Sequence, residues 1–135
     1  LMAADDRICA GAFFLFGGNL PKIITTAKEP NVIKLRDRLI KTIPLPELEN
    51  FLTPFYKEVD PLSYANRLDP AHILIVSANR DKVILPSITK ELWHKIGEPP
   101  WIKLPFAGHF TAAGYFFYGN KKMVKFFKKQ FNEKK

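Results

Sequence analysis

Cysteine, serine and long apolar runs are all scarce in this sequence of 135 residues. The single cysteine, Cys9, allows no internal disulfide bond and excludes a structural zinc site built from cysteines. The longest apolar stretch, Ile8–Phe16, falls far short of the ~18 residues that indicate a membrane span. No signal segment opens the chain, which favours a cytoplasmic location. With 47% hydrophobic and 25% charged residues, the composition is that of one globular domain.

Positive charge is concentrated at the C-terminal end of the chain. The formal net charge is +8, and residues 120–135 contribute +6 through seven lysines and one glutamate. The other 119 residues carry 14 basic and 12 acidic side chains, a net charge of only +2. Because this body lacks the basic stripe of a groove-binding domain, no specific nucleic-acid partner is expected.

Three apolar segments predict β-strands: Arg7–Phe16, His72–Ala78 and Trp101–Phe106. Their apolar runs are continuous rather than alternating, which is typical of strands buried on both faces in a parallel sheet. Strands that alternate with helices favour the α/β class with a parallel sheet. Three strands are few for such a sheet, so we expect the chain to be incomplete.

Helical segments are predicted between and after these strands. Pro54 is expected to cut one of them short, and Gly97 stands where a C-terminal cap belongs. The last helix is expected to bury Val124, Phe127 and Phe131 and to present its lysines to solvent. Apolar spacing places the helices at residues 32–40, 46–56, 86–96 and 120–135.

Two ionisable residues follow consecutive predicted strands. Asp81 comes just after His72–Ala78, and His109 comes just after Trp101–Phe106, 28 residues further on. The carboxyl ends of parallel strands meet at one edge of a sheet, where α/β proteins place their ligands and catalytic groups. An aspartate that orients a catalytic imidazole needs this arrangement. The other two histidines, His72 and His94, are interpreted as structural or surface residues, and no metal site is expected.

The sequence resembles the C-terminal half of the α/β-hydrolase family of esterases, lipases and related peptidases. ILIVSANRDKVILP resembles the family's acid strand and loop, although Ala78 stands where glycine is usual, and PFAGHF resembles its histidine loop. ADDRICAGAFFLFGGN resembles the end of the helix that follows the nucleophile, together with the next strand of the sheet. The resemblance implies one incomplete domain, residues 1–135, in which about three parallel strands have flanking helices. Residues 19–70 would form a lid- or cap-like helical excursion between the first two strands.

The family's nucleophile motif, Gly-x-Ser-x-Gly, is absent. Neither Ser63, Ser77 nor Ser87 has that glycine frame, so the resemblance implies a serine N-terminal to Leu1. It further implies hydrolysis of esters, thioesters or amides without a cofactor, and little activity in the isolated chain. Asp81 and His109 would be the triad's acid and base. In the excursion, the candidate substrate contacts are Phe51, Phe55 and Tyr56.

Two other classes of function stay open. The chain could be a non-catalytic binding module on a hydrolase-derived scaffold, which fits the absence of the serine. It could also be a basic peripheral module whose lysine-rich helix meets an anionic membrane or nucleic acid. An unpaired edge on the first strand predicts a partner: the missing N-terminal half or a second copy of the chain.

Overall fold

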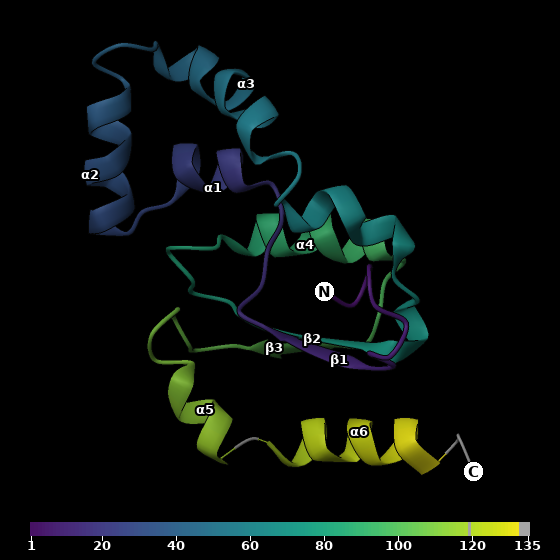
Figure 1. Cartoon of the computed structure of the whole chain (residues 1–135). Coiled ribbons are helices and arrows are strands. Elements are labelled where there is room, and N and C mark those ends of the chain that lie inside the picture. Colours follow the sequence, from purple (N-terminus) through teal and green to yellow (C-terminus); the bar gives the residue numbers. More distant parts are fainter. Residues whose placement is uncertain (119, 133–135) are drawn as a thin grey trace.

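The computed structural model describes residues 1–118 and 120–132, and the side chains within those ranges except at 116–118. Three parallel strands form one sheet in the order β1-β2-β3, with helices on both faces (Figure 1), so the predicted α/β class is confirmed. The strands are β1 (Gly11–Phe14), β2 (Ile73–Ala78) and β3 (Trp101–Leu104). The α-helices are α1 (Leu20–Thr26), α2 (Pro30–Leu39), α3 (Leu45–Tyr56), α4 (Pro86–Ile96), α5 (Ala113–Tyr118) and α6 (Lys121–Asn132), and the 3-10 helices are η1 (Pro61–Arg67) and η2 (Pro70–His72).

The central strand β2 is buried at every position, as its continuous apolar run predicts. Successive side chains of a strand point to opposite faces. Ile73 and Ile75 therefore pack with Leu92 of α4 on one face, whereas Leu74 and Val76 belong to the cluster on the other. Gly97 caps α4 with φ of 98°, as predicted, in a left-handed conformation that favours glycine.

The edge strands are shorter and less buried than predicted. β1 begins at Gly11 rather than Arg7 and is half-buried along its length. Residues before it form a turn in which the Asp5 carboxylate accepts three hydrogen bonds from Arg7. Cys9 precedes the strand and is half-buried, not a core residue.

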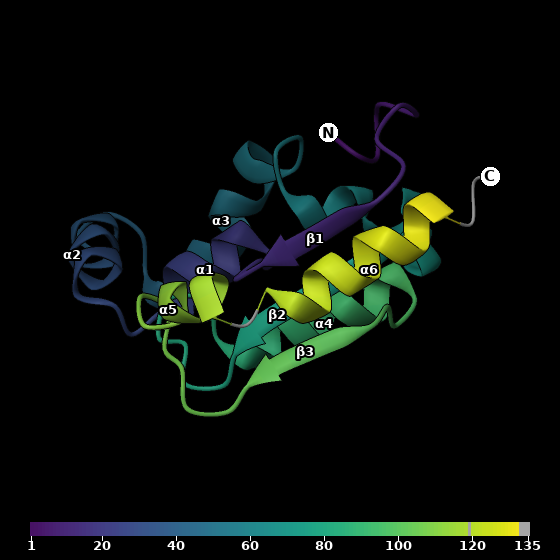
Figure 2. The same cartoon turned by 90° about the horizontal axis from the view of Figure 1, so that it is seen from below.

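Helix α6 lies across one face of the sheet (Figure 2), but its buried side differs from the prediction. Met123 and Gln130 are buried, whereas Val124 and Phe131 are 46% and 56% exposed. Gln130 is buried because its amide has partners: Nε2 donates to the Ala71 carbonyl, and Oε1 lies 2.5 Å from His72 Nδ1. These hydrogen bonds hold the helix with Gln130 facing the protein. Val124 and Phe131, which were predicted to be buried, therefore lie beside the buried side of the helix.

Helices α1, α2 and α3 form a lobe set apart from the sheet (Figure 1), with a small core of its own around Ile24, Leu48 and Leu52. Helix α3 continues through Pro54 to Tyr56, so the expectation that Pro54 ends it was wrong. Tyr56 packs against the lobe's core, and this packing outweighs the hydrogen bond that proline removes.

The lobe is joined to the sheet by a tight connection at Asp60. Its carboxylate, 6% exposed, accepts hydrogen bonds from the backbone N–H groups of Asn19 and Leu20 and from that of Leu62. The Lys22 ammonium also contacts Glu91 of α4 at 2.9 Å, which raises the pKa of Lys22. The chain thus enters and leaves the lobe beside α4.

Candidate active site

The loop after β2 is held against the loop after β3 by its backbone. The N–H of Asn79 donates to the Leu104 carbonyl at 3.0 Å, and that of Arg80 donates to the Ala107 carbonyl at 2.9 Å. β2 and β3 are parallel neighbours, so both loops emerge at the same edge of the sheet. This pairing places Asp81, the residue after Arg80, beside the loop that carries His109.

The Asp81 side chain is buried, with 3% of it exposed, and both of its oxygens are used. Oδ1 accepts hydrogen bonds from the backbone N–H groups of Val83 and Ile84, at 2.8 and 2.9 Å. Oδ2 lies 2.8 Å from Nδ1 of His109. The backbone bonds fix the carboxylate, so that Oδ2 is aimed at the imidazole.

His109 sits in a short turn that its neighbours stabilise. The Gly108 N–H donates to the Thr111 hydroxyl at 2.8 Å, and the Ala112 N–H donates to the Gly108 carbonyl at 3.0 Å. The His109 side chain is 25% exposed. In the part of the chain that the structure describes, Nδ1 contacts Asp81 whereas Nε2 makes no hydrogen bond. An imidazole held in this way can exchange protons through Nε2.

A pocket of about 370 Å³ opens beside His109. The acid loop and the histidine loop form two of its walls, and the connection between α1 and α2 forms a third. The Lys28 N–H donates to the Lys82 carbonyl at 2.7 Å, which joins the lobe to the acid loop. The pocket is lined by Lys28, Glu29, Pro30, Arg80, Lys82, Val83, Gly108, His109, Phe110 and Thr111.

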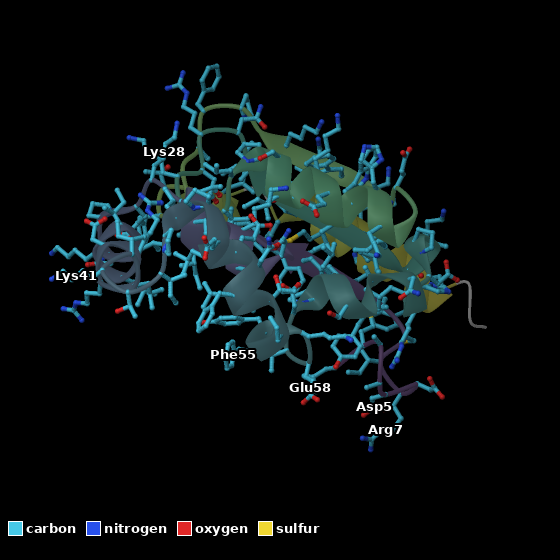
Figure 3. All side chains as sticks on the ribbon, turned by 90° about the horizontal axis from the view of Figure 1, so that it is seen from above. Asp5, Arg7, Lys28, Lys41, Phe55 and Glu58 are labelled. Carbon is cyan, nitrogen blue, oxygen red and sulfur yellow. The ribbon has the colours of Figure 1, made fainter. Side chains whose placement is uncertain are left out.

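Phe51, Phe55 and Tyr56 lie elsewhere, on α3, and none of them lines this pocket. Phe51 and Phe55 are 48% and 70% exposed, and their rings contact each other. Figure 3 shows Phe55 pointing outward at the lower edge of the molecule, away from Lys28 at the upper left. The structure therefore does not bring these three residues to His109, and their contact with substrate stays a prediction.

The three serines also lie away from the pocket. The Ser77 hydroxyl accepts a hydrogen bond from Trp101 Nε1 at 2.8 Å, Ser63 lines a different small pocket, and Ser87 lies in the first turn of α4. Within the described residues, no group of three or more histidine, cysteine or carboxylate side chains could hold a metal ion. None of the helices described there is long and apolar enough to cross a membrane.

No protein-family model matches the sequence, and no curated protein matches it either. A crystal structure assigned to a non-heme bromoperoxidase, BpoC, from Mycobacterium tuberculosis H37Rv does match, with a TM-score of 0.55 and 16% identity. The match covers 96% of this chain but 62% of that one. The chain has a partial α/β-hydrolase fold. At this identity the likeness shows the fold and not the activity.

Sequence reasoning missed the basic side chains that line the pocket of this partial α/β-hydrolase fold. Arg80 and Lys82 flank Asp81, so their nearness to the acid was visible in the sequence. Lys28 reaches the same pocket from the connection between α1 and α2, more than 50 residues before the acid loop, and no local pattern marked it. Thr111, which stabilises the histidine turn, follows Gly108 by three residues, a spacing typical of side-chain capping.

Proposed function

We propose that this chain carries the acid and the base of a serine hydrolase that acts on carboxylic esters, thioesters or amides. The 2.8 Å contact between His109 Nδ1 and Asp81 Oδ2, at the carboxyl edge of a parallel sheet, is the observation that supports this proposal. On this proposal the nucleophilic serine belongs to a segment N-terminal to Leu1.

In this mechanism Nδ1 keeps its proton and donates a hydrogen bond to Asp81, which leaves Nε2 as the base. Nε2 takes the proton of the serine hydroxyl as its oxygen attacks the acyl carbon. The imidazolium that forms lies against the Asp81 carboxylate and is stabilised by it. Nε2 then returns the proton to the departing alcohol, thiol or amine.

The proposal predicts that the chain alone lacks hydrolase activity. A base accelerates acyl transfer only when a nucleophile lies within hydrogen-bond reach, ~2.6–3.2 Å. The placement of Ser63, Ser77 and Ser87 away from the pocket supports a nucleophile from outside the 135 residues.

Hydrolysis of p-nitrophenyl acetate tests this function. The assay compares the chain alone with a longer natural chain that includes the sequence upstream of Leu1. We expect turnover only in the longer chain, and a loss of about 10²–10⁴-fold in His109→Ala, the range for removing a general base. Turnover by the 135-residue chain that depends on His109 would contradict the proposal.

His94→Ala is the matched control, because His94 Nδ1 also lies 2.8 Å from a carboxylate, that of Glu98. That pair is exposed at the C-terminal end of α4 and does not line the pocket. The control variant should keep the wild-type rate. Equal losses of hydrolysis rate in the two variants would show that replacing any histidine lowers the rate, and would contradict a specific role of His109 as the base.

A non-catalytic binding module is the second candidate, and the lack of a serine in the pocket favours it. Such a module would retain the Asp81–His109 contact as a structural feature of the histidine loop. Full-length protein without hydrolase activity, but with an intact pocket that binds a small molecule, would favour this candidate.

A further inference from the structure

The pocket beside His109 gathers positive charge from two separate parts of the chain. Lys28 comes from the connection between α1 and α2, whereas Arg80 and Lys82 come from the acid loop. All three side chains are exposed. The backbone hydrogen bond between Lys28 and Lys82 keeps the two loops together, so the three basic residues line one pocket.

Two acidic groups near the pocket already have hydrogen-bond partners within the protein. Glu29 is the one carboxylate in the lining, and it caps α2: its oxygens accept from the N–H groups of Asn31 and Val32 and from the Asn31 amide. Asp81 lies behind the wall, buried, with Oδ2 on His109. Both carboxylates are therefore already held by hydrogen bonds within the protein.

Within the described residues, none of the three cations forms an ion pair. The Arg80 guanidinium instead lies over the ring of Phe106, 5.6 Å from its centroid. Uncompensated cations in one concave site attract anions and raise their local concentration.

The remaining walls suit an organic molecule. Pro30, Val83 and Phe110 supply apolar surface. The Thr111 hydroxyl is already bonded to Gly108, so the three cations and Nε2 of His109 are the main polar groups left for a ligand. A volume of about 370 Å³ accommodates a small acid or its ester.

We propose that this pocket selects substrates that carry an anionic group, a carboxylate or a phosphate, close to the bond that is cleaved. This inference rests on the proposed function for its reacting bond, but the binding of anions stands on the pocket alone. Lys28, Arg80 and Lys82 would be binding residues with no part in proton transfer. At ~6 Å in a solvated site, each charge contributes roughly a threefold change in affinity, less at high salt.

The test measures binding without turnover. Monomethyl succinate and dimethyl succinate share an ester, but only the first is an anion. Each is titrated into the ¹⁵N-labelled chain, and the amide signals of Gly108 and Thr111 report occupancy. We expect a millimolar dissociation constant for the monoester, weakened by salt, and binding of the diester about 10–30-fold weaker, because the diester carries no charge for the three cations to attract.

A triple variant, Lys28→Gln with Arg80→Gln and Lys82→Gln, should lose about 10–30-fold in affinity for the monoester. Lys41→Gln is the matched control, since Lys41 is exposed and lies at the margin of the molecule outside the pocket lining (Figure 3). Far-UV circular dichroism checks that all variants fold. Equal binding of the two esters, no binding of either, or equal effects of the triple and control variants would overturn the proposal.

The same variants separate this inference from the proposed function. In the longer chain, the triple variant should raise KM for the monoester with kcat unchanged, whereas His109→Ala should lower the turnover of both esters about 10²–10⁴-fold. If turnover depends on His109 but KM is the same for the charged and the uncharged ester, only the anion preference is overturned. Selective anion binding without turnover would overturn only the hydrolase.

Discussion

Two buried aspartates have different surroundings, and the difference indicates their roles. Asp60 accepts hydrogen bonds from three backbone N–H groups and from no described side chain. Asp81 has two backbone donors and directs its remaining oxygen to a partly exposed imidazole. Asp60 thus holds the fold together, whereas Asp81 presents His109 to a pocket.

Removing the Asp60 carboxylate should strongly destabilise the protein. Asp60→Ala leaves three N–H groups without acceptors at a buried site, and we expect the free energy of unfolding to fall by about 2–4 kcal/mol. Asp69→Ala is the control, because Asp69 accepts one backbone bond at the exposed start of η2. Urea unfolding of both variants measures the difference, and similar losses would contradict this role for Asp60.

Sequence reasoning found Asp81 and His109 but not Asp60. The first two follow apolar strands, and a position at the end of a strand is visible in the sequence. Asp60 stands in a polar loop, and two of its partners, Asn19 and Leu20, lie 41 and 40 residues away. Contacts at that separation depend on how the lobe returns to the sheet, which no local pattern encodes.

At the scale of elements, prediction succeeded where a short stretch of sequence carries the signal, such as a continuous apolar run or a glycine cap. β2 and α4 have the predicted bounds to within a residue, since the first is an apolar run and the second ends at Gly97. Helix α1 was missed because Ile23, Ile24 and Thr25 favour strands; the packing of Ile24 in the lobe's core makes this segment helical. Packing of Tyr56 against the lobe's core likewise keeps α3 helical beyond Pro54.

The turn between β1 and α1 should tolerate no side chain at Gly18. A Cβ there would come within 2.9 Å of the Leu62 nitrogen and 2.7 Å of its Cβ. We expect Gly18→Ala to cost about 1–3 kcal/mol of stability, as overpacked sites do. At Gly114 in α5 a Cβ meets nothing within 4 Å, so Gly114→Ala should be neutral or stabilising. Thermal unfolding compares the two, and equal melting temperatures would contradict this account.

On the scale of the whole molecule, β1 is one of the two edge strands of the sheet. Among the described residues it pairs with β2 alone, and its side chains are half-buried. An apolar pocket of about 730 Å³ lies against it, with Gly11, Phe13 and Phe16 in its wall. Hydrophobic edge strands are templates for pairing with another chain.

We therefore expect the isolated chain to self-associate through this edge. Light scattering at micromolar concentrations should give a mass above 15.5 kDa that rises with concentration. The longer chain that supplies the upstream segment should cover the edge and remain monomeric. A constant mass of 15.5 kDa for the isolated chain would show that β1 needs no partner.

The central claim is that His109 and Asp81 serve a serine outside these 135 residues. Labelling with a fluorophosphonate, followed by peptide mapping, tests it most directly, because the reagent forms a covalent bond with an activated serine. We predict one labelled serine in the longer chain, upstream of Leu1, with labelling lost in His109→Ala and retained in His94→Ala. Label on Ser63, Ser77 or Ser87, or labelling that survives His109→Ala, would contradict the claim.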